Sequence, residues 1–202
     1  MEYELTKYDE HYQSLDCKFE NKCIKEVLET FIPKGRRILD IGCGTGLVYG
    51  LLRGRNRIIS TDKRVECRRV MRKKFPNDPI SVFGMNSTEA LDKLFVGQWI
   101  TCTFALHYLP YKDIYKILSN RSVCIVYNKP YLRRDSVYYG KKFKFIKDNL
   151  LKDIFIRLCL KVLPHKRFAL CEAPFYDVII TTGYDNAKKE IRKNFKAKKG
   201  NA

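Results

Sequence analysis

The stretch RRILDIGCGTGLVYGLL, residues 36–52, begins as an apolar strand and then turns through three glycines. The run Ile38–Ile41 is short and apolar, as expected of a buried strand. Gly42, Gly44 and Gly46 follow it, and glycine permits positive φ and a close approach to the backbone. In an open α/β sheet, ligands bind at loops that leave the carboxyl ends of the strands. We therefore expect a ligand at this turn.

Short apolar runs alternate with helical patterns around this stretch, which predicts a doubly wound α/β fold, a mostly parallel sheet with helices on both faces. A first helix is expected over Cys17–Phe31. The expected strands are Arg37–Ile41, Arg57–Thr61, Ile80–Phe83, Trp99–Phe104 and Val123–Tyr127. The expected helices between them are Leu47–Leu52, Arg64–Phe75, Thr88–Phe95 and Lys112–Leu118.

The pattern changes after the fifth strand. Lys141–Val162 is typical of a long basic helix. An apolar stripe runs along it through Phe145, Leu150, Ile154 and Leu158. Two strand-like runs, KRFALCE and FYDVIITTGY, then predict a closing antiparallel hairpin. We expect one domain over residues 1–184, followed by a basic, flexible tail over residues 185–202.

The amino-acid composition limits the kinds of molecule that the protein is expected to bind. The 202 residues carry a formal net charge of +18, a field that attracts polyanions such as RNA. The eight cysteines are scattered without CxxC spacing, and there are only three histidines, so no metal site is expected. Reduced thiols, an acidic polar start and the absence of an apolar run of roughly 20 residues predict a cytoplasmic protein that does not cross a membrane.

The glycine turn has a spacing that separates two families. A dinucleotide-binding GxGxxG turn would need glycine at position 47, which is Leu. The run ILDIGCGTG instead resembles motif I of class I S-adenosylmethionine (SAM)-dependent methyltransferases. The resemblance implies SAM as cofactor and a seven-stranded sheet in the order 3-2-1-4-5-7-6 with the last strand antiparallel. It places the methionine part of SAM against Asp40, Gly42, Cys43, Gly44 and Gly46.

Two further positions match where this family contacts the nucleoside. Asp62 ends the second strand, where a carboxylate accepts both ribose hydroxyls; the alternative is a cap for the helix expected from Arg64, which is compatible with a ribose contact. Asn86 stands where the family commonly has an Asp that reads the adenine amino group, and it or Ser87 could instead be a helix cap. Phe104 ends the fourth strand, at the family's motif IV beside the cofactor.

The run FALHYL, residues 104–109, bears on the acceptor. It resembles the FxxHY run of mRNA cap guanine-7 methyltransferases, which implies that His107 and Tyr108 are catalytic and contact the guanine. Small-molecule methyltransferases of the menaquinone-biosynthesis type read FALHHL there, and a strand-end histidine satisfied by the backbone is a third interpretation. The chain has no run like the cap family's Asn-Asn-Trp-Ile-Lys segment, although Glu172 would match a glutamate presented to guanine.

A basic, aromatic segment supports an RNA substrate without reference to a family. Residues 129–147 contain seven Lys or Arg, including Arg133 and Arg134, one Asp and five aromatic residues. Cations follow phosphates, and aromatic rings stack on unpaired bases. The same segment could be an amphipathic connector with solvated lysines. The alternatives to an RNA methyltransferase are a small-molecule methyltransferase and a catalytically silent SAM-fold subunit that binds RNA or a partner protein.

Overall fold

The computed structural model describes residues 15–120, 122–128, 142–162, 168–172 and 176–181. The chain divides into two compact units, unit 1 (residues 1–103) and unit 2 (residues 104–202), which are described in turn. Strands and helices alternate through both units, so the predicted α/β class is confirmed.

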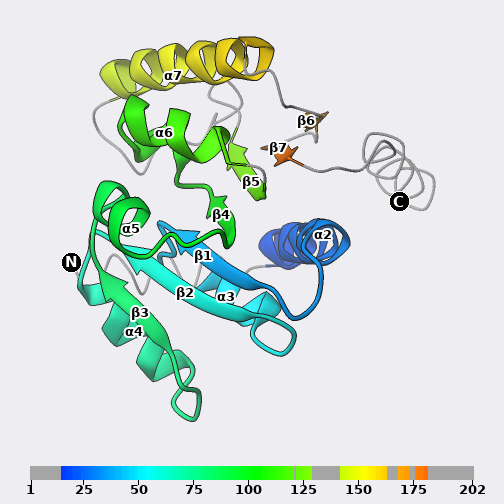
Figure 1. The fold of residues 1–202 in the computed structure, drawn as a ribbon, viewed down its shortest axis with the longest axis vertical. Coiled ribbons are helices and arrows are strands. Elements are labelled where there is room, and N and C mark those ends of the chain that lie inside the picture. The colour runs from blue at the N-terminus through cyan, green and yellow to red at the C-terminus, as the bar shows by residue number, and fades with distance from the viewer. Residues whose placement is uncertain (1–14, 121, 129–141, 163–167, 173–175, 182–202) are drawn as a thin grey trace. The chain divides into compact units, whose positions relative to one another are not determined.

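Unit 1 is built on parallel strands (Figure 1). They are β1 (Arg37–Ile41), β2 (Arg57–Asp62), β3 (Ser81–Gly84) and β4 (Trp99–Thr103). They pair in the order β3-β2-β1-β4, and each pairing is parallel. Every residue of β1 after Arg37 is buried, as expected for a central parallel strand covered on both faces. The register places Asp40 opposite Ser60 and Thr101.

The helices of unit 1 cover both faces of these strands. They are α2 (Leu15–Phe31), α3 (Leu47–Leu52), α4 (Glu66–Lys74) and α5 (Ser87–Lys93). Helices α3 and α4 lie on one face and α5 lies on the other (Figure 1). Helix α4 buries Cys67 and Met71 and turns its remaining side chains towards solvent. This arrangement leaves the carboxyl ends of β1 and β2 next to the glycine turn.

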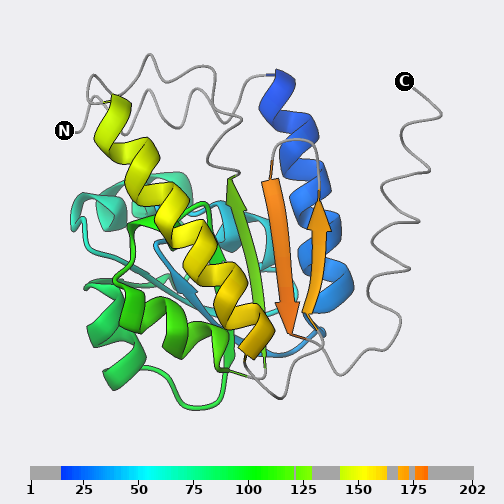
Figure 2. The same ribbon diagram turned by 90° about the horizontal axis from the view of Figure 1, so that it is seen from above.

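The described part of unit 2 contains a turn, two helices and an antiparallel group of strands. Its elements are the 3-10 turn η1 (Leu106–Tyr108), α6 (Tyr111–Leu118), β5 (Val123–Asn128), α7 (Lys142–Val162), β6 (Phe168–Glu172) and β7 (Tyr176–Thr181). Strand β7 pairs antiparallel with β5 and with β6, and the three lie side by side in Figure 2. The predicted C-terminal hairpin is therefore confirmed.

Of the apolar stripe predicted for α7, Ile154 and Leu158 do not lie on its buried face, and the side chains of Phe145 and Leu150 are outside the described part of the chain. Ile154 and Leu158 are 47% and 53% exposed, whereas Asp153, Ile156 and Cys159 are buried. Asp153 tolerates burial because its carboxylate accepts a hydrogen bond of 2.9 Å from Arg157, one helical turn away. Of the helices in the described ranges, none is both long and apolar enough to cross a lipid bilayer.

Candidate cofactor site and acceptor residues

The glycine turn leaves β1 in a left-handed path. Gly42, Gly44 and Gly46 have φ values of +72°, +52° and +86°, which side chains rarely permit. The backbone N–H groups of Gly42 and Cys43 donate to the carbonyl of Thr61 at 2.8 and 2.9 Å. The turn is therefore tied to the end of β2, and the residues predicted to hold one ligand come from two neighbouring strands.

The glycines are required for different physical reasons. A Cβ on Gly46 would lie 3.0 Å from Met71 Cε and 3.2 Å from Phe75 Cε2, so close packing against α4 demands glycine there. A Cβ on Gly44 would meet only Arg64 Nη2, at 3.9 Å. Gly46 is therefore needed for packing, whereas Gly44 leaves its outer side open; that the three glycines admit a ligand stays a prediction.

Asp40 is the most deeply buried acid of the turn, with 1% of its surface exposed. Its Oδ1 accepts a hydrogen bond of 2.9 Å from Thr101 Oγ1, while its Oδ2 has no hydrogen-bond partner. Burial raises the pKa of Asp40 to about 7, an effect opposed by the Thr101 hydrogen bond and reinforced by the charge of Asp62. Near neutral pH the carboxyl is poised between two states, and a cation beside Oδ2 would favour the ionised one.

Asp62 lies beside the same turn in a different electrostatic setting. Its Oδ2 accepts from Gly44 N at 3.0 Å, and its Oδ1 accepts from Arg64 N at 2.9 Å. The Arg64 guanidinium adds Nε at 3.2 Å to Oδ1 and Nη2 at 3.4 Å to Oδ2. These four donors match the roughly four lone-pair sites of a carboxylate. Ribose hydroxyls could therefore bind Asp62 only if the Arg64 side chain leaves it.

The two capping alternatives for Asp62 and Asn86 have different outcomes. Helix α4 begins at Glu66 after Val65, without a side-chain cap, so Asp62 is not its N-cap. Asn86 is the N-cap of α5: its Oδ1 accepts from Glu89 N at 2.9 Å, and Glu89 Oε2 accepts from Asn86 N at 3.2 Å. The amide NH₂ of Asn86 is not used by this capping box.

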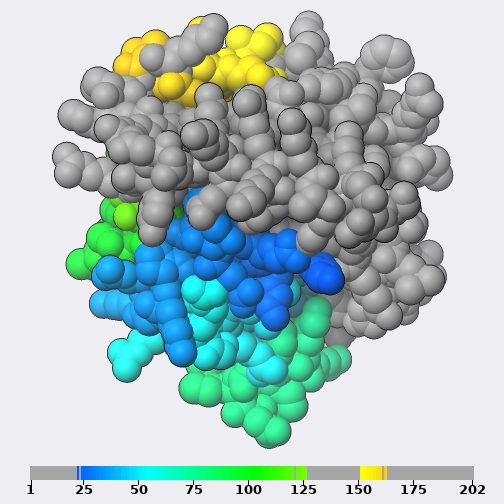
Figure 3. All heavy atoms as spheres, turned by 90° about the vertical axis from the view of Figure 1, so that its right-hand side faces the viewer, coloured from blue at the N-terminus to red at the C-terminus, as the bar shows by residue number. Residues whose placement is uncertain are grey.

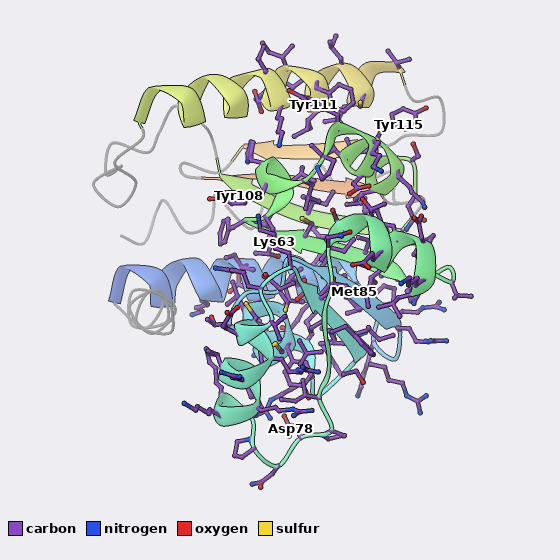
Figure 4. All side chains as sticks on the ribbon, turned by 90° about the vertical axis from the view of Figure 1, so that its left-hand side faces the viewer. Lys63, Asp78, Met85, Tyr108, Tyr111 and Tyr115 are labelled. Atoms are coloured by element: carbon purple, nitrogen blue, oxygen red, sulfur yellow. The ribbon has the colours of Figure 1, made fainter. Side chains whose placement is uncertain are left out.

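The residues predicted to meet the acceptor belong to unit 2, as does Phe104, which was predicted to bind the cofactor. Phe104 has a φ of +57°, a strained conformation for a bulky residue, and its N–H donates to Val126 O at 2.6 Å. His107 and Tyr108 follow in η1, where His107 is buried and Tyr108 is 49% exposed (Figure 4). Lys152 from α7 donates to the carbonyls of His107 at 2.6 Å and Leu109 at 2.8 Å. The backbone of η1 is thereby held by α7.

The structure brings part of the predicted set together. Asp40, the three glycines, Cys43 and Asp62 meet at the turn of unit 1, and Cys43 is buried. Arg133 and Arg134 lie outside the described residues. Glu172 ends β6 opposite Asp177, and its side chain is likewise not described. Within the described ranges, no group of three or more His, Cys, Asp or Glu is arranged to hold a metal.

Three functional candidates were missed at the level of sequence. Thr101 is a polar residue inside the apolar run of β4, and that placement is a weak signal of a buried partner such as Asp40. Arg64 follows Asp62 by two residues, but nothing in the sequence indicates that its side chain folds back. The contact of Lys152 with η1 joins residues more than forty positions apart and has no local signal.

Comparison with known proteins was made once this geometry was established. No family model and no curated protein sequence matches the chain. Among solved structures, a Methanococcus maripaludis protein assigned to the SAM-dependent methyltransferases aligns with a TM-score of 0.61 and 15% identity, over 91% of this chain and 94% of its own. The plantazolicin methyltransferase BamL, crystallised with a triazolic desmethyl analogue and S-adenosylhomocysteine (SAH), aligns at 0.62 and 14%, over 99% and 84%.

A third structure, the PH0226 protein of Pyrococcus horikoshii, aligns with a TM-score of 0.57 and 8% identity, over 85% of this chain and 97% of its own. At such low identity the likeness concerns the fold. The chain has the Rossmann-like fold of parallel strands and helices that is found in SAM-dependent methyltransferases.

Proposed function

We propose that the protein is a SAM-dependent methyltransferase. The observation that carries this proposal is the Asp40 carboxyl, which is buried at the carboxyl end of β1 with Oδ2 unsatisfied. A buried polar atom without a partner is costly, and a ligand ammonium would supply the missing partner. The fold shared with BamL, which was crystallised with SAH, supports this choice of ligand.

The residues at the turn fit this cofactor. Asp40 would accept from its ammonium, and the open side of Gly44 would admit its chain beside Cys43. Asp62 would accept the ribose hydroxyls after Arg64 moves, and Asn86 would offer its free amide NH₂ to adenine; Phe104 is assigned to the cofactor's edge by resemblance alone. When bound, SAM supplies an electrophilic sulfonium methyl. The chain's own contribution is to hold donor and acceptor in line and close together.

We further propose that the strands of the two units form one seven-stranded sheet in the order β3-β2-β1-β4-β5-β7-β6. The order β3-β2-β1-β4 within unit 1 and the order β5-β7-β6 within unit 2 are consistent with it. The alignments with the M. maripaludis protein and BamL, which cover 91% and 99% of the chain, support it as well.

The acceptor we favour is RNA, and in particular the guanine-7 position of an mRNA 5′ cap. The FALHYL run, the net charge of +18 and the basic, aromatic residues 129–147 support this choice. His107 and Tyr108 would contact the guanine, with Glu172 presented to it, while Arg133 and Arg134 would bind RNA phosphates. Guanine nitrogen 7 already carries a free lone pair, so positioning would suffice and no general base would be needed.

A small-molecule acceptor is the second candidate. The observation that favours it is the likeness to BamL over 99% of the chain, since the BamL structure holds an analogue of its plantazolicin substrate. A hydroxyl or carbon acceptor would require a base, and His107 is the residue placed for that task. A residual rate without pH dependence in His107→Ala would favour positioning, and a rate that collapses together with its pH dependence would favour base catalysis.

Two measurements test the proposal in sequence. Calorimetry should show SAH binding to the wild-type protein and much weaker binding to Asp40→Ala; no binding to either would overturn the methyltransferase assignment. Tritium transfer from labelled SAM is then compared between an RNA with an unmethylated guanosine cap and the same RNA uncapped. Label on the capped RNA alone supports the cap, label on both indicates an internal site, and label on neither refutes an RNA acceptor.

A further inference from the structure

One face of α4 is entirely cationic. Arg68, Arg69, Arg72 and Lys73 are exposed, and the helical period of 3.6 residues brings them to one side. The opposite side carries Cys67 and Met71, which are buried. Helix α4 contributes part of the molecular surface seen in Figure 3, where it is drawn in blue-green. We call these four exposed residues the α4 basic face.

Some arginines of unit 1 have carboxylate partners, and the arginines of this face have none within the part of the chain that the structure describes. Arg53 pairs with Asp78, and Arg55 Nη1 lies 3.8 Å from Glu29 Oε1. For Arg68, Arg69 and Arg72, no carboxylate among the described residues lies within ion-pair distance. The acidic residue of α4 itself is Glu66, in the first turn. The charges of these three arginines are therefore not compensated by any carboxylate that the structure describes.

The charges of this face act on the helix in both directions. Arg72 and Lys73 lie in the last turn, where the helix dipole favours cations. Arg68 and Arg72, like Arg69 and Lys73, are four residues apart, and like charges at that spacing repel each other. Arg68 also lies near the N-terminal end of α4, where the helix dipole disfavours a cation. A polyanionic ligand would relieve both sources of repulsion. The geometry therefore favours such a partner.

The chemistry of the face favours phosphates over other anionic partners. Planar guanidinium groups bind phosphate with two parallel hydrogen bonds. Side chains four residues apart on a helix are about 6 Å apart at Cβ, an interval similar to that between phosphates along a nucleic-acid strand. Arginine is also common at protein interfaces, together with aromatic anchors, but the four residues of this face are all charged.

We propose that the α4 basic face binds the phosphate backbone of the RNA substrate, an inference that rests on the proposed RNA methyltransferase function. Helix α4 starts four residues after Asp62. Figure 4 shows the two ends of this region: the exposed Lys63 directly follows β2, and Asp78 lies beyond the C-terminal end of α4. The RNA strand would thus run past the residue assigned to the ribose of the cofactor. This surface is distinct from residues 129–147, which the sequence had indicated.

The test compares two variants that lose the same charge. The first carries Arg68→Gln, Arg69→Gln and Arg72→Gln on the α4 basic face. The matched control carries Lys34→Gln, Arg36→Gln and Arg37→Gln, three exposed residues around the start of β1. The affinity for a short fluorescent single-stranded RNA is measured by anisotropy from 50 to 300 mM salt. SAH affinity and thermal unfolding confirm that both variants keep the fold.

Each phosphate contact with single-stranded nucleic acid contributes about 0.7 to the slope of log affinity against log salt. Loss of three contacts should make that slope less negative by about 2 and should weaken binding about 100-fold at 0.1 M salt. We expect these changes in the α4 variant and little change in the control. Equal effects in both variants, or no change in slope in the α4 variant, would overturn the inference while leaving the proposed function intact.

The remaining outcomes separate the inference from the function on which it rests. If wild-type protein binds SAH but no RNA at 50 mM salt, both the RNA acceptor and this inference are refuted, and the cofactor assignment stands. If poly-glutamate binds in place of RNA and the α4 variant abolishes that binding, the face takes an acidic protein, which also overturns the inference.

Discussion

Replacing Asp40 by Asn should separate two effects of the buried carboxylate: the stability that it removes when it is ionised, and its contribution to ligand affinity. The pKa of Asp40 is about 7 against an ordinary value of 3.8, because burial penalises the ionised form. A shift of about 3 units corresponds to about 4 kcal/mol of lost stability once the group is ionised. That loss develops as pH rises from about 4 to about 7, because the folded pKa is raised and protonated Asp40 is the stable form.

Two consequences of this Asp40→Asn change can be measured. The free energy of unfolding of the wild-type protein, relative to that of the variant, should fall between pH 4 and pH 7 and level off above pH 7. In binding, about a tenth of Asp40 is ionised at pH 6 and about nine tenths at pH 8 when its pKa is about 7. If the ionised form accepts the ligand ammonium, SAH affinity should rise about tenfold over that range.

Calorimetry at several pH values gives the ratio of wild-type to Asp40→Asn affinity for SAH, which cancels the titration of the ligand itself. Repeating the wild-type measurement at pH 7 in buffers of different ionisation enthalpy should reveal about half a proton released for each SAH bound, since half of Asp40 is protonated there. A ratio that stays flat from pH 6 to pH 8, with no proton release, would refute the assignment of Asp40 to the ammonium.

The other predictions concern single backbone or side-chain features. Arg64→Met should bind SAH about two- to fivefold more tightly by calorimetry, because it removes a partly exposed competitor for Asp62; equal or weaker binding would contradict this. Gly46→Ala should lower the free energy of unfolding by about 1–3 kcal/mol more than Gly35→Ala in denaturant titrations. Both glycines have positive φ, but only Gly46 has close neighbours, so equal losses would argue against packing. In the same titrations, the free energy of unfolding of Phe104→Gly should exceed that of Phe104→Ala by about 1 kcal/mol, because glycine accepts the positive φ at this position. The usual order, with the alanine variant more stable, would contradict a positive φ in solution.

The sequence predicted strands better than it predicted where helices begin. Strand β1 was placed to the residue, because Arg37 and Gly42 bracket its apolar run. Helix α4 was expected from Arg64 but begins at Glu66, because Asp62 binds the Arg64 N–H and keeps that residue in the loop. Strand β4 was expected to include Phe104, whose positive φ ends it at Thr103.

The failure over α7 has a physical cause. Apolar periodicity selects the side with the most aliphatic residues, and Ile154 and Leu158 satisfy that rule while exposed to solvent. The buried side contains Asp153, which a hydrophobic pattern rejects but which its bond to Arg157 makes tolerable. The hydrogen bond between Asp153 and Arg157 thus permits a buried face that the hydrophobic pattern alone does not predict.

At the candidate site, local motifs predicted the residues but not their electrostatic states. The run around Asp40 located the turn, and spacing located Asp62. The hydrogen bond to Asp40 Oδ1 comes from Thr101, 61 residues away, and the saturation of Asp62 depends on a rotamer of Arg64. RNA contact was predicted at residues 129–147, although the helical spacing of Arg68 and Arg72 was already visible in the sequence. Long-range contacts and side-chain rotamers are therefore the features of the candidate site that the sequence does not predict.

The two carboxylates also restrict which nucleotides the turn could accept. A dinucleotide places a pyrophosphate against a glycine turn of this kind, where backbone N–H groups and a helix N-terminus normally stabilise it. Here the Gly44 N–H is already bound to Asp62, and Asp40 lies buried next in line. A doubly charged phosphate beside these acids would be repelled by Asp62 and by ionised Asp40, whose pKa is raised mainly by burial and to a smaller extent by the charge of Asp62. A ligand that brings a cation to Asp40 and neutral hydroxyls to Asp62 reverses each of these penalties, and SAM has that distribution of charge.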